Sequence, residues 1–213
     1  MVSLLKKIRS KHKHGLLAHT LSHKIGQKGL RIYPYYLIQE RKDTDDPPDI
    51  KDNIEEYTFQ FMVPEDIEIL PESEELSRSK SVFRKRLDKG NKCFCAQHHG
   101  QIVAYTWFDF EACRFIEPLF NLKENEAYLF DMYTLKSHRG KNIAPHLRYK
   151  SYEALNEMGR DTFFSISEYF NAPAIKFKKK LNAKFLGTYI MFDLYRKWKG
   201  NLRIRGDKIR KKN

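Results

Sequence analysis

Short apolar and aromatic runs alternate with polar segments along most of the chain, and they predict a series of strands. Runs rich in Val, Ile, Tyr and Phe that are bounded by Gly, Pro, Asn or Asp are typical of strands. The expected strands cover residues 31–39, 57–63, 92–97, 101–110, 127–135, 162–167 and 184–195. In the first run Pro34 has no backbone N–H to donate, which predicts a strand at the edge of a sheet.

Apolar residues at helical spacing predict helices between these strands. The expected helices cover much of 65–87, where Pro71 divides two pieces, and all of 143–158 and 172–181. Gly159 is placed to end the second of them. Strands and helices in this order indicate an α/β or α+β domain with a mixed sheet.

The N-terminal segment 2–25 reads as a basic helix whose two halves are separated by Gly15. Three interpretations remain open for it. The segment packs on its own domain, or it lies in the plane of an anionic membrane with its apolar residues among the headgroups, or it contacts nucleic acid or an acidic protein.

Charge is distributed unevenly along the 213 residues, whose formal net charge is +13. Residues 1–42 hold ten Lys and Arg against one Glu, and 196–213 hold nine against one Asp, whereas 43–75 hold thirteen Asp and Glu against one Lys. The acidic, proline-bearing stretch 43–52 is typical of a linker. We therefore expect three parts, namely a basic helical arm with an edge strand and an acidic linker (1–52), a main domain (53–197) and a basic tail (198–213).

Composition excludes several classes of protein. No run of about 18 apolar residues is present, so an ordinary transmembrane helix is not expected. Three cysteines without a secretory signal indicate reduced thiols and a cytoplasmic location. Neither the cysteines nor the histidines show convincing zinc spacing, and His98-His99 reads as a solvent-facing turn, so we expect no metal.

The segment most informative about chemistry follows the strand 127–135. Arg139-Gly140-Lys141-Asn142-Ile143-Ala144 is a basic turn with small residues, and a helix begins directly after it. The first amides of a helix have no partner within the helix and lie at its positive end, where phosphate binds. Gly140 allows close approach of an oxygen, and Asn142 tolerates a positive φ. An ordinary basic helix start is the alternative interpretation.

A second motif lies in the next helix. Asn171-Ala172-Pro173-Ala174 begins that helix, and Lys180-Leu181-Asn182-Ala183-Lys184-Phe185 follows it. Together the two motifs resemble the GNAT superfamily of N-acetyltransferases, which carry an Arg/Gln-x-x-Gly-x-Gly/Ala turn and then Asn-x-x-Ala. Asn142 stands where Gly is usual. The resemblance covers about 55–195.

This resemblance implies a mostly antiparallel central sheet of six to seven strands, splayed at a cofactor cleft and flanked by about four helices. It also implies acetyl-CoA or another acyl-CoA as co-substrate. Thr134 and Leu135 would hydrogen-bond the pantetheine arm through backbone groups, amides from Arg139 to Ala144 would hold the pyrophosphate, and Asn171 would reach the pantetheine. Lys178 stands where many members place the Tyr that acts as general acid, so it is expected to pair with phosphate or to protonate the thiolate.

Two carboxylates are candidates for catalysis. Asp131 lies within an apolar strand, where an acid is costly unless it is paired or functional, so it is either the general base or a structural hydrogen-bond partner. Glu168 ends the strand 162–167, where it either binds the cationic acceptor or is simply exposed. The general acid is left unassigned.

The expected acceptor is a small primary amine such as an amino sugar. Residues 1–25 would contact the inner face of the membrane in one variant, and an acyl-carrier protein would supply the acyl group in another. A nucleic-acid partner is not favoured for the enzyme. The alternative function is an inert domain of the same fold that binds anionic membrane or nucleic acid through its basic ends, 1–25 and 203–212.

Overall fold

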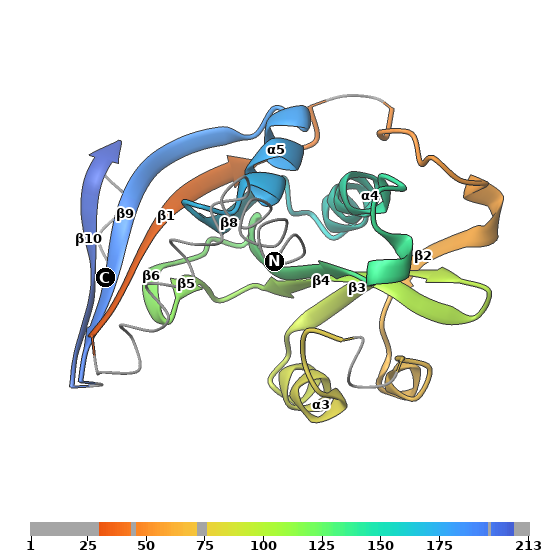
Figure 1. Cartoon of the computed structure of the whole chain (residues 1–213), viewed down its shortest axis with the longest axis horizontal. Coiled ribbons are helices and arrows are strands. Elements are labelled where there is room, and N and C mark those ends of the chain that lie inside the picture. Colours follow the sequence, from red (N-terminus) through yellow and green to blue (C-terminus); the bar gives the residue numbers. More distant parts are fainter. Residues whose placement is uncertain (1–29, 44–45, 72–75, 196, 207–213) are drawn as a thin grey trace, which may run out of the picture. The chain divides into compact units, whose positions relative to one another are not determined.

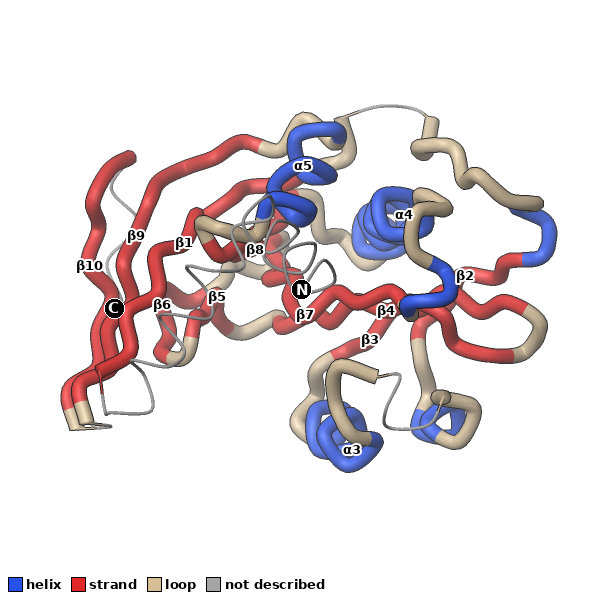
Figure 2. Tube along the Cα trace, viewed as in Figure 1, coloured by secondary structure: helices blue, strands red, loops and turns tan. Residues whose placement is uncertain are grey.

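The computed structural model describes residues 30–43, 46–71, 76–195 and 197–206 (Figure 1). Eight strands form one sheet in the order β10-β9-β1-β8-β7-β4-β3-β2, and β5 and β6 form a two-stranded sheet. The predicted class, an α/β domain with a mixed sheet, is confirmed, although the sheet is larger than expected. Three α-helices accompany it within the described ranges (Figure 2). The predicted N-terminal helix lies outside the described residues.

The strands are β1 (Leu30–Glu40), β2 (Tyr57–Phe61), β3 (Lys92–His98), β4 (Gln101–Asp109), β5 (Ala112–Phe115), β6 (Glu117–Asn121), β7 (Glu126–Thr134), β8 (Thr162–Glu168), β9 (Lys184–Leu194) and β10 (Trp198–Gly206). The helices are α3 (Lys80–Asp88), α4 (Ile143–Glu157) and α5 (Ala172–Lys180), with short 3₁₀ helices η1 (Ile54–Glu56), η2 (Pro64–Ile67) and η3 (Lys136–His138). Contacts divide the chain into two compact units. The predicted boundaries after residues 52 and 197 stay predictions.

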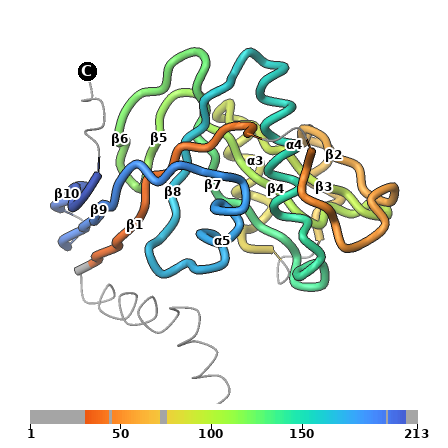
Figure 3. Tube along the Cα trace, turned by 90° about the horizontal axis from the view of Figure 1, so that it is seen from above, coloured from red at the N-terminus to blue at the C-terminus, as the bar shows by residue number. Residues whose placement is uncertain are grey.

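Unit 1 consists of 1–40, 114–121 and 165–213. β1 pairs antiparallel with β9, which pairs antiparallel with β10 on its other side, and the three run side by side (Figure 3). The buried ring of Tyr35 stacks on Tyr189 at 5.5 Å and contacts Phe115 at 4.7 Å. Its hydroxyl donates to Asn201 Oδ1 at 2.8 Å, so β10 is tied to the core through β1.

Pro34 does not place β1 at an edge, and that prediction is wrong, since β1 lies between β9 and β8. The carbonyl of Pro34 accepts from Tyr169 N at 2.9 Å, just after β8 ends at Glu168. The N and the C=O of a strand residue point to the same side, so the position of the missing N–H of Pro34 also faces the chain just after β8. No carbonyl within β8 therefore loses a hydrogen-bond donor. An inner strand therefore accommodates this proline.

Unit 2 consists of 41–113 and 122–164. β2, β3, β4 and β7 pair antiparallel in that order, with α4 on one face and α3 on the other (Figure 1). α4 buries nine of its fifteen residues, and those at four-residue spacing along one face are at most 1% exposed: Ile143, Leu147, Ser151 and Leu155. On the other face the buried Phe83 of α3 contacts Tyr105 and Trp107 edge-on. Two hydrophobic layers thus hold β4 fixed.

Several predicted elements differ from the observed ones. The helical segment 65–87 becomes η2 and α3, and 72–75 lie outside the described residues. The hairpin β5–β6 was not predicted, because Ile116 between its strands adopts φ 71°, which an exposed β-branched residue rarely does. Part of the predicted tail 198–213 forms β10. Among the described residues, no helix has both the length and the apolar character needed to cross a bilayer.

Candidate cofactor site

The turn 139–144 lies between β7 and α4, as the sequence predicts. Leu135 N donates to Val103 O at 2.9 Å, which extends the β4–β7 ladder one residue past β7. The chain then makes the 3₁₀ turn η3, and α4 begins at Ile143. Gly140 has φ 86° and Asn142 has φ 65°, so both adopt the left-handed conformation that reverses the chain. The predicted positive φ of Asn142 is confirmed.

The start of α4 can bind an anion. Within the part of the chain that the structure describes, no backbone carbonyl accepts from the N–H groups of Gly140 through Ala144. A Cβ placed on Gly140 would meet nothing within 4 Å, so the backbone there is open to a ligand. Unpartnered amides at the positive end of a 15-residue helix form a phosphate-binding arrangement.

The acidic segment before η1 braces this turn. Lys51 N donates to Lys141 O at 2.8 Å, and Asn142 Nδ2 donates to Asp49 O. The ammonium of Lys141 pairs with Asp52 Oδ2 at 2.5 Å. Hydrogen bonds from Lys141 and then from Tyr57 lower the pKa of Asp52 to about 2. Lys141 is therefore held by a carboxylate, and the backbone of the turn supplies the main anion-binding groups.

Arg139 folds back along the end of β7. Its Nε donates to Thr134 O at 3.0 Å, and its guanidinium lies 5.2 Å from the ring centre of Tyr133. The backbone groups predicted to meet the pantetheine are thus partly engaged, since Leu135 N is also bonded to β4. Thr134 Oγ1 is buried and has no hydrogen-bond partner among the described residues. It is a polar atom for which a bound cofactor would provide a partner.

A β-bulge interrupts β7. The pairing with β4 passes from Tyr105↔Tyr133 to Trp107↔Phe130, so two β7 residues lie opposite one β4 residue. Asp131, one of the two, has φ 46°. A bulge leaves backbone groups outside the regular ladder and increases the local twist. Such a strand offers an N–H to an oxyanion, as the sequence analysis expected.

The carboxylate of Asp131 is held by two arginines. Arg86 Nη1 lies 2.7 Å from Asp131 Oδ2 in a close ion pair without hydrogen-bond geometry, and Arg78 Nε donates to the same oxygen at 3.2 Å. Arg86 also lies over the ring of Trp107. Both arginines contact the same oxygen, Oδ2, and together they fix the position of the carboxylate. These contacts favour the structural interpretation of Asp131, and its role as a base stays a prediction.

Lys178 lies in a buried cluster of unit 1. Its ammonium donates to Glu40 Oε1 at 3.0 Å and to Ser165 Oγ, and Ser165 Oγ donates to Glu40 as well. The side chains of Lys178 and Glu40 are 4% and 0% exposed. The predicted contact of Lys178 with phosphate or thiolate would require it to leave this pair, so the geometry favours a role in holding α5 against β1 and β8.

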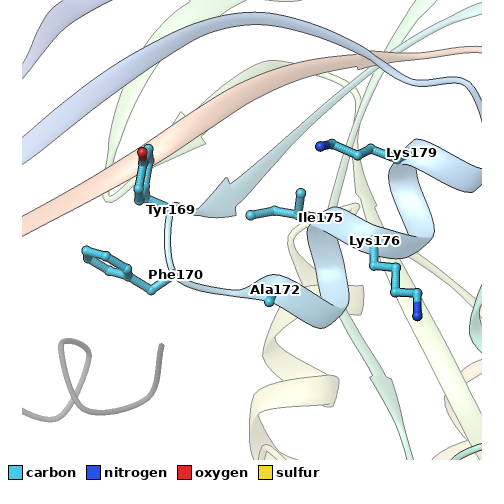
Figure 4. A pocket seen from close by; sticks show the side chains of 6 residues that line it. All are labelled: Tyr169, Phe170, Ala172, Ile175, Lys176 and Lys179. Atoms are coloured by element: carbon cyan, nitrogen blue, oxygen red, sulfur yellow. The ribbon is translucent and has the colours of Figure 1, made fainter. Parts of the chain in front are cut away.

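Asn171 caps α5, because its Oδ1 accepts from Ala174 N at 3.2 Å. Glu168 is half-buried at the end of β8. Beside them lies a pocket of about 440 Å³ lined by Tyr169, Phe170, Ala172, Ile175, Lys176 and Lys179. Ile175 and Lys179 extend toward the two rings, whereas Lys176 points away from them (Figure 4). Apolar surface beside a cation suits a ligand with an apolar body and a negative charge.

The domain combines a bulged strand with an open turn whose amides are unpartnered, and a helix begins directly after that turn. These are features of a protein that binds a phosphate-bearing cofactor. The model of a family described as "Acetyltransferase (GNAT) family" matches residues 51–183, more than half of the chain. The chain belongs to this family, so acyl transfer from CoA is the chemistry that its membership supports. No curated protein sequence matches the chain.

Solved structures agree on the fold. A GNAT-family putative acetyltransferase from Novosphingobium aromaticivorans is 17% identical with a TM-score of 0.50, over 76% of this chain and 65% of that one. A GNAT acetyltransferase from Colwellia psychrerythraea is 14% identical with a TM-score of 0.54, over 78% and 57%. The glucosamine N-acetyltransferase region of a fungal multi-domain GH3 β-N-acetylglucosaminidase is 12% identical with a TM-score of 0.56, over 83% and 23%. The chain thus spans less than two thirds of each of these chains.

Three parts of this arrangement were not found from the sequence. The bracing by 48–52, the Arg78–Arg86 clamp on Asp131 and the partner of Lys178 all join residues that are far apart in the chain. Two signals for the Glu40–Lys178 pair were available in the sequence. Lys178 stands where many family members have Tyr, and Glu40 is the one acidic residue in an otherwise basic N-terminal segment.

Proposed function

We propose that the chain transfers an acetyl or other acyl group from coenzyme A to a small primary amine. The observation that carries this proposal is the turn 139–144, which has unpartnered amides, a positive φ at Gly140 and Asn142, and open space over Gly140. The buried, unpartnered Thr134 Oγ1 at the end of β7 supports the same ligand. Family membership makes acyl-CoA the phosphate-bearing ligand of choice.

The reaction requires three events. The neutral amine attacks the thioester carbonyl and forms a C–N bond, the resulting oxyanion collapses with cleavage of the C–S bond, and the proton lost by the amine balances the one gained by the thiolate. An N–H at the β7 bulge is suited to the oxyanion. Glu168 is the carboxylate that we propose for the cationic form of the acceptor, because it ends β8 directly before the pocket residues Tyr169 and Phe170.

An amino sugar is the acceptor that we test first. The fold likeness to a region that acts on glucosamine motivates this choice, and the exposed rings of Tyr169 and Phe170, next to Glu168, suit the apolar face of a sugar. Lys179, which extends toward these rings, favours an acceptor that also bears an acidic group. An acyl-carrier protein as the acyl donor is the variant suited to a basic chain.

Cofactor binding is tested by calorimetric titration with acetyl-CoA. Gly140→Ala places a methyl group where the diphosphate approaches, and we expect a loss of affinity of about tenfold or more. Gly90→Ala is the matched control, because Gly90 also has a positive φ (80°) and nothing within 4 Å of an added Cβ. Both variants carry the same backbone strain, so only a selective loss in Gly140→Ala supports the proposal. No binding by the unaltered chain near millimolar ligand would refute it.

Turnover is tested by following the free thiol of CoA in the presence of glucosamine, of an acidic amino sugar and of a peptide amine. The chain's own thiols interfere little, since Cys93, Cys95 and Cys113 are buried. Thiol release that depends on an amino sugar supports the proposed acceptor. Release with the peptide alone contradicts the acceptor while retaining acyl transfer, and binding without release from any amine contradicts catalysis.

A membrane-facing role is favoured by one specific feature of β10. Trp198, Leu202 and Ile204 are more than half exposed and alternate with basic residues along this outermost strand. We propose that β10 and the segment 1–25 contact anionic lipid together. Cosedimentation with vesicles containing phosphatidylserine tests this, with Trp198→Ser and Leu202→Ser expected to weaken it. Equal binding to neutral vesicles, or no effect of the two substitutions, would count against it.

A further inference from the structure

A cluster of metal-ligating side chains lies in unit 2, on residues outside the turn 139–144. Glu56 ends η1, whereas His98 and His99 lie at the turn between β3 and β4. One ligand atom from each residue lies within 4.8 Å of the other two. His98 is mostly buried, with its side chain 14% exposed, whereas His99 and Glu56 are open at 70% and 39%. The cluster is therefore anchored on one side and accessible on the other.

The spacing suits one tetrahedral ion. Nitrogen and oxygen ligands bound at about 2.0–2.2 Å to such an ion lie about 3.3–3.6 Å from each other. Glu56 Oε2 lies 3.1 Å from His98 Nε2 and 3.4 Å from His99 Nε2. Small side-chain rotations bring all three to the required separation, and two histidines with one carboxylate leave the fourth position open, as in many zinc sites.

The outer groups hold these ligands in the orientation that a metal needs. His98 Nδ1 lies 3.4 Å from His138 Nε2, and His138 Nδ1 lies 2.9 Å from Ser137 Oγ. With its proton on Nδ1, His98 donates to His138 and turns the lone pair of Nε2 toward Glu56. Asn53 Nδ2 donates to Glu56 Oε1 at 3.2 Å, which leaves Oε2 for the ion.

Packing and backbone conformation point the same way. The ring of Tyr57 stacks on His98 with 4.5 Å between centres, which fixes the plane of the imidazole. His99 has φ 49° and Gly100 has φ 75°, so the two-residue hairpin has a positive φ at both positions. Asn-Gly is the ordinary sequence for such a turn, and a histidine held in this less favourable conformation is a reason to look for a function.

We propose that Glu56, His98 and His99 bind one divalent transition ion of the zinc class, with His138, Ser137 and Asn53 as positioning residues. The ion would join η1 to the β3–β4 hairpin and, through the contact of His98 with His138, to the residue directly before Arg139. The site does not depend on the acyl transfer proposed above, because none of its ligands belongs to the turn 139–144. Sequence reasoning missed it because Glu56 lies 42 residues from His98.

The test is calorimetric titration of the full chain with Zn²⁺ alone, without CoA. His19 and His23 are four residues apart in the sequence, so both are replaced by Gln in every protein to remove that pair. We expect one equivalent to bind in the micromolar range or tighter. Glu56→Gln and His99→Asn should each weaken binding by about tenfold or more. His99→Asn creates the favoured Asn-Gly turn, so its fold is not at risk.

Two further measurements keep the result specific. Glu55→Gln is the matched control, because Glu55 is an exposed neighbour outside the cluster, and it should bind Zn²⁺ as the parent does. Co²⁺ in place of Zn²⁺ should give the intense visible absorption of a tetrahedral ion. Binding no tighter than millimolar, equal binding by Glu56→Gln and His99→Asn, or an equal loss in Glu55→Gln would each overturn the proposal.

Discussion

Replacing Lys178 by Met is the sharpest test of the buried cluster in unit 1. Met preserves most of the length and volume of the side chain but provides no proton donor. Glu40, whose side chain is fully buried, then keeps Ser165 as a donor and loses the ammonium of Lys178. Removing the ammonium leaves this buried carboxylate with less compensation for its charge, and the folded state is destabilised relative to the unfolded one.

The magnitude follows from the burial of both partners. Removing one member of a buried ion pair typically costs about 3–5 kcal/mol, a large share of the roughly 5–15 kcal/mol that stabilises a domain. The double variant Lys178→Met with Glu40→Gln removes both charges of this pair, and the amide oxygen of Gln still accepts from Ser165. We expect it to recover most of the loss, since neutral replacements of buried pairs are often tolerated.

The measurement is unfolding in urea, which leaves charge interactions unscreened. Lys178→Met should lower the urea concentration at the midpoint of unfolding by roughly 1–2 M, and the dependence of the unfolding free energy on urea concentration should not change. Lys179→Met is the matched control, because Lys179 is exposed on the next position of α5, and its free energy of unfolding should change by at most about 0.5 kcal/mol. Equal midpoints for Lys178→Met and Lys179→Met, or a double variant less stable than Lys178→Met, would refute the reasoning.

Three further predictions concern unit 2. Asn142→Val should destabilise the folded chain by about 1–2 kcal/mol in thermal unfolding, because a β-branched residue is strained at a φ of 65°. Asn142→Gly loses only the hydrogen bond to Asp49 and should cost less stability. A larger loss in Asn142→Gly than in Asn142→Val would contradict this. Asp52 has a lowered pKa of about 2, so its pairing with Lys141 stabilises the fold above pH 4, and this contribution disappears as the pH falls toward 2. The stability difference between the unaltered chain and Asp52→Asn should therefore shrink across that window, and a difference that grows there would be inconsistent with it. Burial raises the pKa of the Cys93 thiol well above its usual value and that of Cys95 to about 12, so both should react with a thiol reagent at pH 8 only after denaturation, as a time course in and out of urea would show.

Local chemistry explains which features were predictable. The turn Arg139–Ala144 and α4 were predicted correctly because glycine and asparagine at positive φ, and buried residues at four-residue spacing, are recognisable within a few positions of the sequence. The end of α4 at Gly159, which has φ 76°, is confirmed for the same reason.

Features that depend on distant partners were not predictable in this way. Pro34 lacks its N–H whether the strand lies at an edge or inside a sheet. Only the end of β8 opposite Pro34 allows this strand to lie inside the sheet. Lys178 meets Glu40 across 138 positions, and Asp131 meets Arg78 across 53. A single sequence does not encode such pairings as a pattern, since the intervening chain is free to place either residue elsewhere.

The segment before η1 has a consequence for any attempt to shorten the chain from its N-terminal side. Its acidic, proline-bearing sequence looks expendable, yet Asp49 O, Lys51 N and Asp52 Oδ2 hold three groups of the turn 139–144. A shortened chain that begins at residue 53 would keep every residue of the two family motifs and lose the frame around the first of them. Fragments meant to bind CoA should therefore begin before Pro48, whose carbonyl accepts from His146 Nδ1 at 2.9 Å.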